Sequence, residues 1–179
     1  MQIETTGTVN CGTRVADGSW ARPSGDFHIG FWRKQSTAVD GSAPDRAPFG
    51  KINSGLTSGW LAWNPATKST MAFGVVTSGG FFGFDLVGNI NDGNPHLFIA
   101  TYKSSDGTVS MYQDDPTNTN VTGAANSGGV VWGADDTFLG CAFGIWANQG
   151  RDYGAFIQRA WCASGIPTQA QRQAIWAMR

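Results

Sequence analysis

Residues 94–115 constrain the fold most strongly, because they read as two β-strands joined by a short polar turn. The strands cover residues 96–102 and 108–112. The Asp106-Gly107 step between them accepts the positive φ that tight hairpin loops require. The stretch predicts an antiparallel β-hairpin. We expect its apolar residues to face the core, namely Leu97, Ile99, Val109 and Met111. We expect Tyr102 and Tyr112 to support an outer surface.

Short strand patterns recur along the rest of the chain. In residues 26–33, Phe27, Ile29 and Phe31 alternate with other residues and give one apolar face. Further strands are predicted at residues 2–9, 59–64, 70–76, 80–87, 130–132, 137–146 and 153–162. Gly, Pro, Ser and Asn predict loops at residues 10–25, 34–58 and 114–129, and the two later loops are candidate places for function.

The end of the chain differs, because residues 169–178 contain no Gly, Pro or turn residue. Thr168 is a favourable N-cap, and Gln171 three residues later completes a capping box. An apolar side at helical spacing is formed by Ala170, Ala174 or Ile175, and Met178. We therefore expect one short helix packed on the sheets.

These elements predict an all-β fold, an antiparallel two-sheet β-sandwich with a short C-terminal α-helix. At 179 residues the chain fits one domain, residues 1–179. Within it, residues 1–25 form an N-terminal strand and loop arm, and residues 166–179 form the helical end.

The charge pattern argues against several partners. The chain has 12 basic and 13 acidic residues, and the basic ones are scattered, which predicts neither nucleic-acid nor membrane-surface binding. No signal peptide or apolar membrane span is visible. Charged residues make up only 14% of the chain, a composition common in β-rich proteins of large assemblies or the cell exterior.

The three cysteines match neither a zinc site nor a disulfide framework. We expect Cys11, Cys141 and Cys162 to be buried thiols, with one Cys141–Cys162 bridge as the alternative.

The order of three segments resembles the concanavalin A-like jelly roll, and within it the laminin-G-like and pentraxin-like domains. The segments are residues 26–34 (DFHIGFWRK), 96–114 and 154–175. The resemblance implies a two-sheet sandwich and an association with glycans. At two places the sequence departs from the family pattern, so the resemblance does not assign calcium ligands to residues of this chain. Asp115-Pro116 replaces the usual Gly after Tyr-x-Asp, and Ile157 and Gln158 stand where the closing strand usually has an acidic residue.

The residues do not predict an enzyme. Glycoside hydrolysis needs two carboxylates flanking the scissile bond. Glu4 is the single Glu, and Asp85 stands alone on its predicted strand. A polysaccharide lyase would need a cluster of His, Tyr and Arg, and we expect His28 and His96 to line strands. Polysaccharide hydrolase or lyase activity is therefore the weakest hypothesis.

We predict no cofactor and no metal-ligand set, although one structural calcium ion stays an alternative. The acidic and amide residues at predicted turns suit ordinary turn geometry as well as calcium: Asp92, Asn94, Asp114, Asp115, Asp135, Asp136 and Asp152.

Four tryptophans are the candidate ligand-binding residues: Trp32, Trp60, Trp63 and Trp146. Glycan binding needs exposed aromatic faces with polar groups nearby. Because Trp60 and Trp63 are an odd step apart, they face opposite sides of a strand, so one can be core and the other exposed. For each tryptophan taken singly, packing against a second layer or a subunit is the favoured interpretation.

The leading functional hypothesis is a non-catalytic structural or adhesion module of a larger assembly. We expect a bacteriophage virion protein, such as a capsid decoration, head-fibre or tail component, which is a homo-oligomer and contacts other virion subunits. A host-surface glycan is a further expected partner. The alternative is a secreted or surface carbohydrate-binding lectin-like module, located outside the cell.

Overall fold

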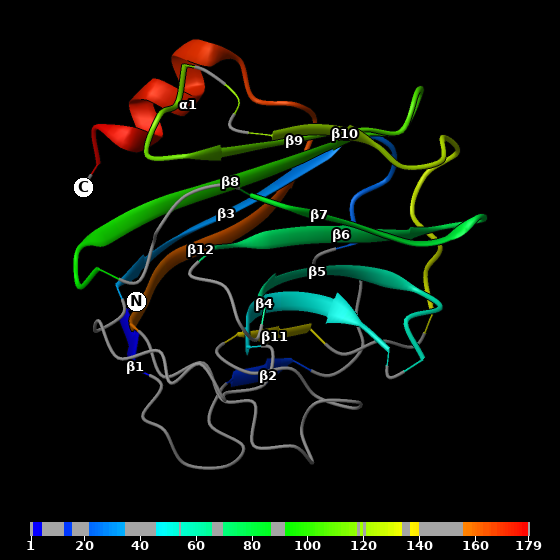
Figure 1. Cartoon of the computed structure of the whole chain (residues 1–179), viewed down its shortest axis with the longest axis horizontal. Coiled ribbons are helices and arrows are strands. Elements are labelled where there is room, and N and C mark those ends of the chain that lie inside the picture. Colours follow the sequence, from blue (N-terminus) through cyan, green and yellow to red (C-terminus); the bar gives the residue numbers. More distant parts are fainter. Residues whose placement is uncertain are drawn as a thin grey trace.

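The computed structural model describes residues 2–4, 13–15, 22–34, 46–53, 55–65, 70–86, 92–117, 119, 121–133, 137–139 and 156–178. Two antiparallel sheets pack face to face (Figure 1). The strand order of sheet A is β1 (Gln2–Glu4), β12 (Phe156–Ser164), β3 (Phe27–Lys34), β8 (Pro95–Lys103), β9 (Thr108–Gln113), β10 (Val121–Ala124). The order of sheet B is β2 (Thr13–Val15), β11 (Thr137–Leu139), β4 (Arg46–Ile52), β5 (Gly59–Asn64), β6 (Ala72–Thr77), β7 (Gly80–Asp85). The predicted two-sheet sandwich is confirmed.

The predicted hairpin forms β8 and β9, which lie between β3 and β10 in sheet A. Lys103 pairs with Thr108, and the Asp106 carboxylate accepts a hydrogen bond from the Thr108 amide at 3.0 Å. Gly107 has a φ of 73°, and a Cβ at this position would lie within 2.8 Å of the Ala125 carbonyl carbon. Both the backbone conformation and the close approach of Ala125 therefore require glycine here.

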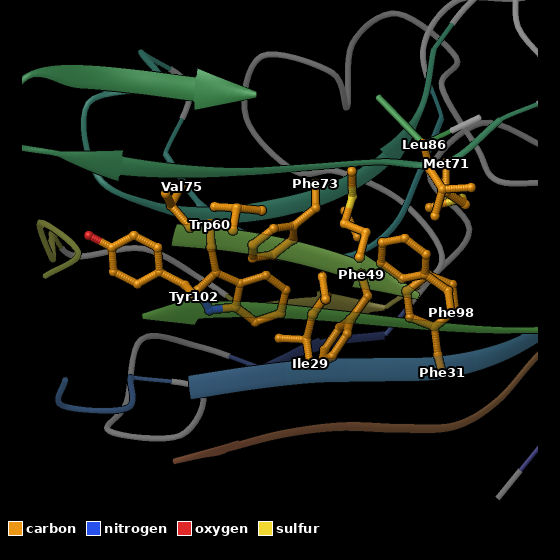
Figure 2. Close-up of a cluster of buried hydrophobic side chains, with 14 of the residues drawn as sticks. Ile29, Phe31, Phe49, Trp60, Met71, Phe73, Val75, Leu86, Phe98 and Tyr102 are labelled. Carbon is orange, nitrogen blue, oxygen red and sulfur yellow. The ribbon is translucent and has the colours of Figure 1, made fainter. Parts of the chain in front are cut away.

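The core lies between the sheets and is largely aromatic (Figure 2). Phe27, Ile29 and Phe31 point into it from β3, as the period-2 pattern predicted. Trp60 of β5 is fully buried, and its ring centre lies 4.9 Å from that of Phe49 in an edge-on contact.

The orientation expected for the hairpin residues is confirmed for β9, where Val109 and Met111 lie in the core and Tyr112 lies on the outer face. It is wrong for Leu97, Ile99 and Tyr102 of β8, a strand that is buried on both faces. Tyr102 lies in the core between the sheets, where its hydroxyl donates to the Asn126 carbonyl at 2.8 Å. Leu97 and Ile99 lie on the opposite face with Tyr112. A strand buried on both faces loses the alternation that would reveal which of its sides is the core.

Helix α1 (Gln169–Trp176) covers that outer face of sheet A (Figure 1). Its predicted capping box is present, because Thr168 and Gln171 bond to each other's backbone amides. The predicted apolar side is wrong in part: Ala170, Ala174 and Met178 are exposed, whereas Arg172 is buried and Ile175 and Trp176 are half-buried.

Arg172 connects α1 to the loop that follows β9 and to the segment that precedes the helix. Its guanidinium donates hydrogen bonds to the carbonyl oxygens of Pro116, at 2.8 Å, and Pro167, at 2.6 Å.

Three predicted loops contain strands. Strand β4 falls within residues 34–58, β10 within 114–129, and β2 within 10–25. Pro48 made the β4 segment look like a loop in the sequence. In the structure it lies at a register shift between Arg46 and Phe49, an irregularity at which a strand tolerates proline. Residues 130–132 form no strand, although the Val131 backbone bonds to Gly59 and Val76. Of the strand predicted at 137–146, only Thr137–Leu139 falls within the described residues.

Cys162 is a free thiol, so a Cys141–Cys162 bridge is excluded, and it is half-buried where full burial was expected. Burial raises the pKa of this thiol to about 12. Cys11 and Cys141 lie outside the described residues. No helix in the described part of the chain is long and apolar enough to cross a membrane.

Candidate functional site

A groove runs between α1 and the outer face of β3 and β12. It consists of two adjacent cavities, of about 370 and 290 Å³, which share His28 and Ile175 as lining residues. We call it the outer groove. The smaller cavity is lined by His28, Trp32, Arg159, Trp161, Ile175 and Met178. The larger cavity is lined by His28, Ser164, Gly165, Ile166, Pro167, Gln171, Ala174 and Ile175.

A β-bulge in β12 shapes the floor of the outer groove. Gln158 pairs with Trp32 and Trp161 pairs with Gly30, so Arg159 and Ala160 together lie opposite Phe31. One extra residue in a strand redirects the side chains around it. Arg159 has a φ of 50°, a left-handed conformation that is unusual for a residue other than glycine, and its side chain is exposed at the groove.

Gly30 makes room for the Trp161 indole on the outer face of sheet A. A Cβ at position 30 would lie 2.8 Å from Trp161 Cε2, and closer still to two other ring atoms. The indole therefore lies against the backbone of β3, between the outward-facing side chains of His28 and Trp32. It offers a half-exposed aromatic surface next to Arg159.

The wall of the groove is fixed by stacked tryptophans. The ring centres of Trp32 and Trp176 lie 5.4 Å apart with an interplanar angle of 25°. Trp32 is only 6% exposed, and its indole Nε1 is buried with no acceptor in the described part of the chain. Met178 at the rim is 52% exposed. The smaller cavity thus combines a rigid aromatic lining with an accessible apolar rim.

His28 lies at the junction of the two cavities. Its Nδ1 lies 2.8 Å from the Gly165 carbonyl oxygen, which can only accept, so Nδ1 carries the proton. Burial lowers the pKa of His28, an effect that outweighs the opposing bond to Gly165. The neutral imidazole therefore has Nε2 left as a hydrogen-bond acceptor.

A second polar cluster ties the start of β8 to the end of β9. His96 Nδ1 lies 2.6 Å from Asp114 Oδ2, and His96 Nε2 lies 2.8 Å from Asp92 Oδ1. Asp114 also accepts from the Leu97 amide at 2.9 Å and donates its own amide to the Leu97 carbonyl. His96 is almost buried and both of its ring nitrogens face carboxylates, so we interpret this cluster as a structural clasp between the ends of the two strands.

The described turn residues show ordinary turn geometry. Asp92 accepts from the Asn94 amide and Asp115 from the Thr117 amide, each at 2.8 Å. Within the described ranges, no group of three or more His, Cys, Asp or Glu side chains could hold a metal ion. Asp135, Asp136 and Asp152 lie outside those ranges.

The structure separates the four tryptophans singled out from the sequence. Trp60 is 0% exposed in the core and cannot reach a ligand, which removes it as a binding candidate. Trp63, as the odd spacing implied, faces the other way, lying half-buried against Phe81 on the outer face of sheet B. Trp32 lines the outer groove, which lies on the opposite face of the sandwich from Trp63. Trp146 lies outside the described residues.

The sequence reasoning missed Trp161, Trp176 and Arg159, which build the outer groove. One signal could have found Trp161. Gly30 is a small residue on the outward face of an aromatic strand, and such a position leaves space for a large neighbouring ring.

No protein-family model and no curated protein sequence matches the chain. Several solved structures have the same fold. A heptameric SAP-like pentraxin from Limulus polyphemus aligns with a TM-score of 0.67 at 12% identity, over 98% of this chain and 81% of that chain. The CBM40 domain of Ruminococcus gnavus IT-sialidase, solved bound to α2,3 sialyllactose, gives 0.69 at 12% identity over 98% and 97%.

The binding domain of botulinum neurotoxin serotype G aligns with a TM-score of 0.71 at 9% identity. This chain is covered over 99% of its length but spans only 42% of that domain. At these identities the likeness is one of fold. The chain has a concanavalin A-like, pentraxin-like β-sandwich fold, as the segment order predicted.

Proposed function

We propose that the chain is a non-catalytic glycan-binding module and that the outer groove is its binding site. The observation that carries the proposal is the half-exposed Trp161 indole packed against Gly30, which lines one cavity together with a neutral His28 and an exposed Arg159. Sugars bind through stacking of their apolar ring faces on aromatic side chains and through hydrogen bonds from their hydroxyl groups. This combination of surfaces is available in the outer groove.

The chemistry of the groove also supports binding without a metal ion. Calcium prefers carboxylate and carbonyl oxygen ligands, and neither cavity has a carboxylate among its described lining residues. Two of the exposed large apolar side chains, Ile166 and Met178, lie at the groove, where a ligand would cover them. The structural neighbour solved with sialyllactose shows that a sandwich of this fold can carry a glycan.

A glycan array probed with the full chain tests the proposal. We expect wild-type protein to bind a subset of glycans, with EDTA having no effect, and Trp161→Ala to lose binding. The matched control is Trp63→Ala, because Trp63 lies on the outer face of the other sheet. Loss of binding only in Trp63→Ala would move the site to sheet B, and absence of any binding by folded wild-type protein would refute the proposal.

We further propose that the module works as a homo-oligomeric component of a larger assembly, a bacteriophage virion being our first choice and a secreted lectin the alternative. The supporting observations are the low charged fraction of 14% and the exposed Val131, which lines neither cavity of the outer groove. Sedimentation of the full chain at micromolar concentration tests this. A stable monomer with no affinity for virus particles would contradict it.

A further inference from the structure

The two cavities of the outer groove differ in chemistry. The smaller one is walled by Trp32, Trp161 and Met178, so its surface is almost entirely apolar except for Arg159. The larger one includes the polar side chains of Ser164 and Gln171. Because His28 and Ile175 line both, the cavities are neighbouring compartments of one groove, and their combined size is in the range of ligand sites.

The smaller compartment has an unneutralised positive charge. Arg159 is exposed, and no hydrogen bond or ion pair links its guanidinium to another described residue. No Asp or Glu lines either compartment within the described part of the chain. His28 beside it is neutral and presents an acceptor, so it does not add a second cation. A guanidinium alone in an apolar surface is suited to pairing with a planar carboxylate.

The backbone of Arg159 is a second, independent observation. Its φ of 50° is an unfavourable conformation for a residue with a Cβ, and it results from the bulge opposite Phe31. The same bulge permits Trp161 to lie over Gly30. One local irregularity therefore places the cation and the aromatic surface in the same compartment.

We infer that the outer groove takes an acidic oligosaccharide of at least two units. A carboxylated sugar lies on Trp161 with its carboxylate at Arg159, and a neutral sugar occupies the compartment of Ser164 and Gln171. A hydroxyl group near the junction donates to Nε2 of His28. The inference rests on the proposed function and specifies the ligand class of that site.

The test compares array hits that carry a carboxylated sugar with the same oligosaccharides after chemical reduction of the carboxyl group to an alcohol. Titration calorimetry should show the carboxylated disaccharide binding the wild-type chain at least about tenfold more tightly, the effect of one charge-assisted hydrogen bond. Arg159→Gln should abolish this difference. Lys34→Gln, which makes the same charge change at an exposed position outside both compartments, should preserve it.

The second compartment is tested by Ser164→Ala, because Ser164 lines only that compartment whereas Gln171 also forms the capping box of α1. This variant should weaken the disaccharide severalfold and leave the carboxylated monosaccharide unchanged. The inference would be overturned, while the proposed function stands, if the wild-type chain bound carboxylated and reduced ligands equally. In that case Arg159→Gln would not change the affinity, and Trp161→Ala would still abolish binding. A preference for sulfated over carboxylated glycans would also overturn it. Failure of every glycan to bind would reject both.

Discussion

The guanidinium carbon of Arg172 lies 4.1 Å from the centre of the Tyr112 ring, which fixes α1 over β9. With its hydrogen bonds to Pro116 and Pro167, this cation–π contact makes Arg172 the main polar attachment of the helix. We predict that Arg172→Ala lowers the free energy of unfolding by about 3 kcal/mol. Urea denaturation measures the loss, and amide hydrogen exchange over residues 170–176 should rise.

Gln169→Ala is the control for Arg172, because Gln169 is exposed in the first turn of α1. It should change stability by less than about 0.5 kcal/mol. If Arg172→Ala left exchange across the helix unchanged, packing of Ile175 and Trp176 alone would hold α1 in place.

Gly30 should not tolerate a side chain. Gly30→Ala forces the Trp161 ring from its place on β3, and overpacking of this kind costs about 1–3 kcal/mol. We predict that loss in urea denaturation, together with a shift in tryptophan fluorescence and loss of glycan binding.

Gly55→Ala is the matched control, since the nearest atom to its Cβ would be Thr57 Cγ2 at an ordinary 3.4 Å. A Gly30→Ala variant as stable as wild type, with unchanged fluorescence, would show that the indole is not confined by Gly30.

Arg159 offers the opposite case, a change that should stabilise the fold. Asn tolerates the left-handed conformation better than Arg, so Arg159→Asn should raise the free energy of unfolding by about 0.5–1 kcal/mol. The neighbouring Gln158→Asn should lower it, because Asn is a poor strand residue. Destabilisation by Arg159→Asn beyond 1 kcal/mol would mean that the arginine side chain itself supports the bulge.

Local pattern predicted much of the fold. The alternation of Phe27, Ile29 and Phe31 identified the buried face of β3, and Thr168 with Gln171 identified the start of α1. Where packing overrode local preference, prediction failed. Strand β4 was not predicted because its segment contains Pro48. The core-facing side of β8 was predicted wrongly because both of its faces are buried.

The candidate site was far less predictable. It depends on the register shift between Gln158 and Trp161, which brings Trp161 opposite Gly30. The residue in the left-handed conformation is Arg159, so no glycine marks the bulge in the sequence. The sequence named Trp60 and Trp63 among four candidate tryptophans, and their spacing showed that the two face opposite sides of the strand. It did not show that Trp60 is the one in the core.

The clasp of Asp92, His96 and Asp114 implies that the stability of the fold decreases in acid. Hydrogen bonds from the Asn94 side chain and amide, followed by that from His96, hold the pKa of Asp92 well below its ordinary value. Likewise Lys103, and then Thr108, lower the pKa of Asp106 to about 2. Because both pKa values are lower in the folded state, their contribution is complete above about pH 5 and is lost as the pH falls toward 2.

We therefore expect the urea midpoint of the wild-type chain to fall steadily from pH 5 to pH 2. Asp92→Asn should lower the midpoint at pH 7 and make the decline shallower, because one stabilising carboxylate has been removed. Asp85→Asn, which removes a carboxylate from β7 of the other sheet, should leave the decline as steep as in wild type. A decline equally steep in Asp92→Asn would show that the clasp does not couple folding to proton binding in this range.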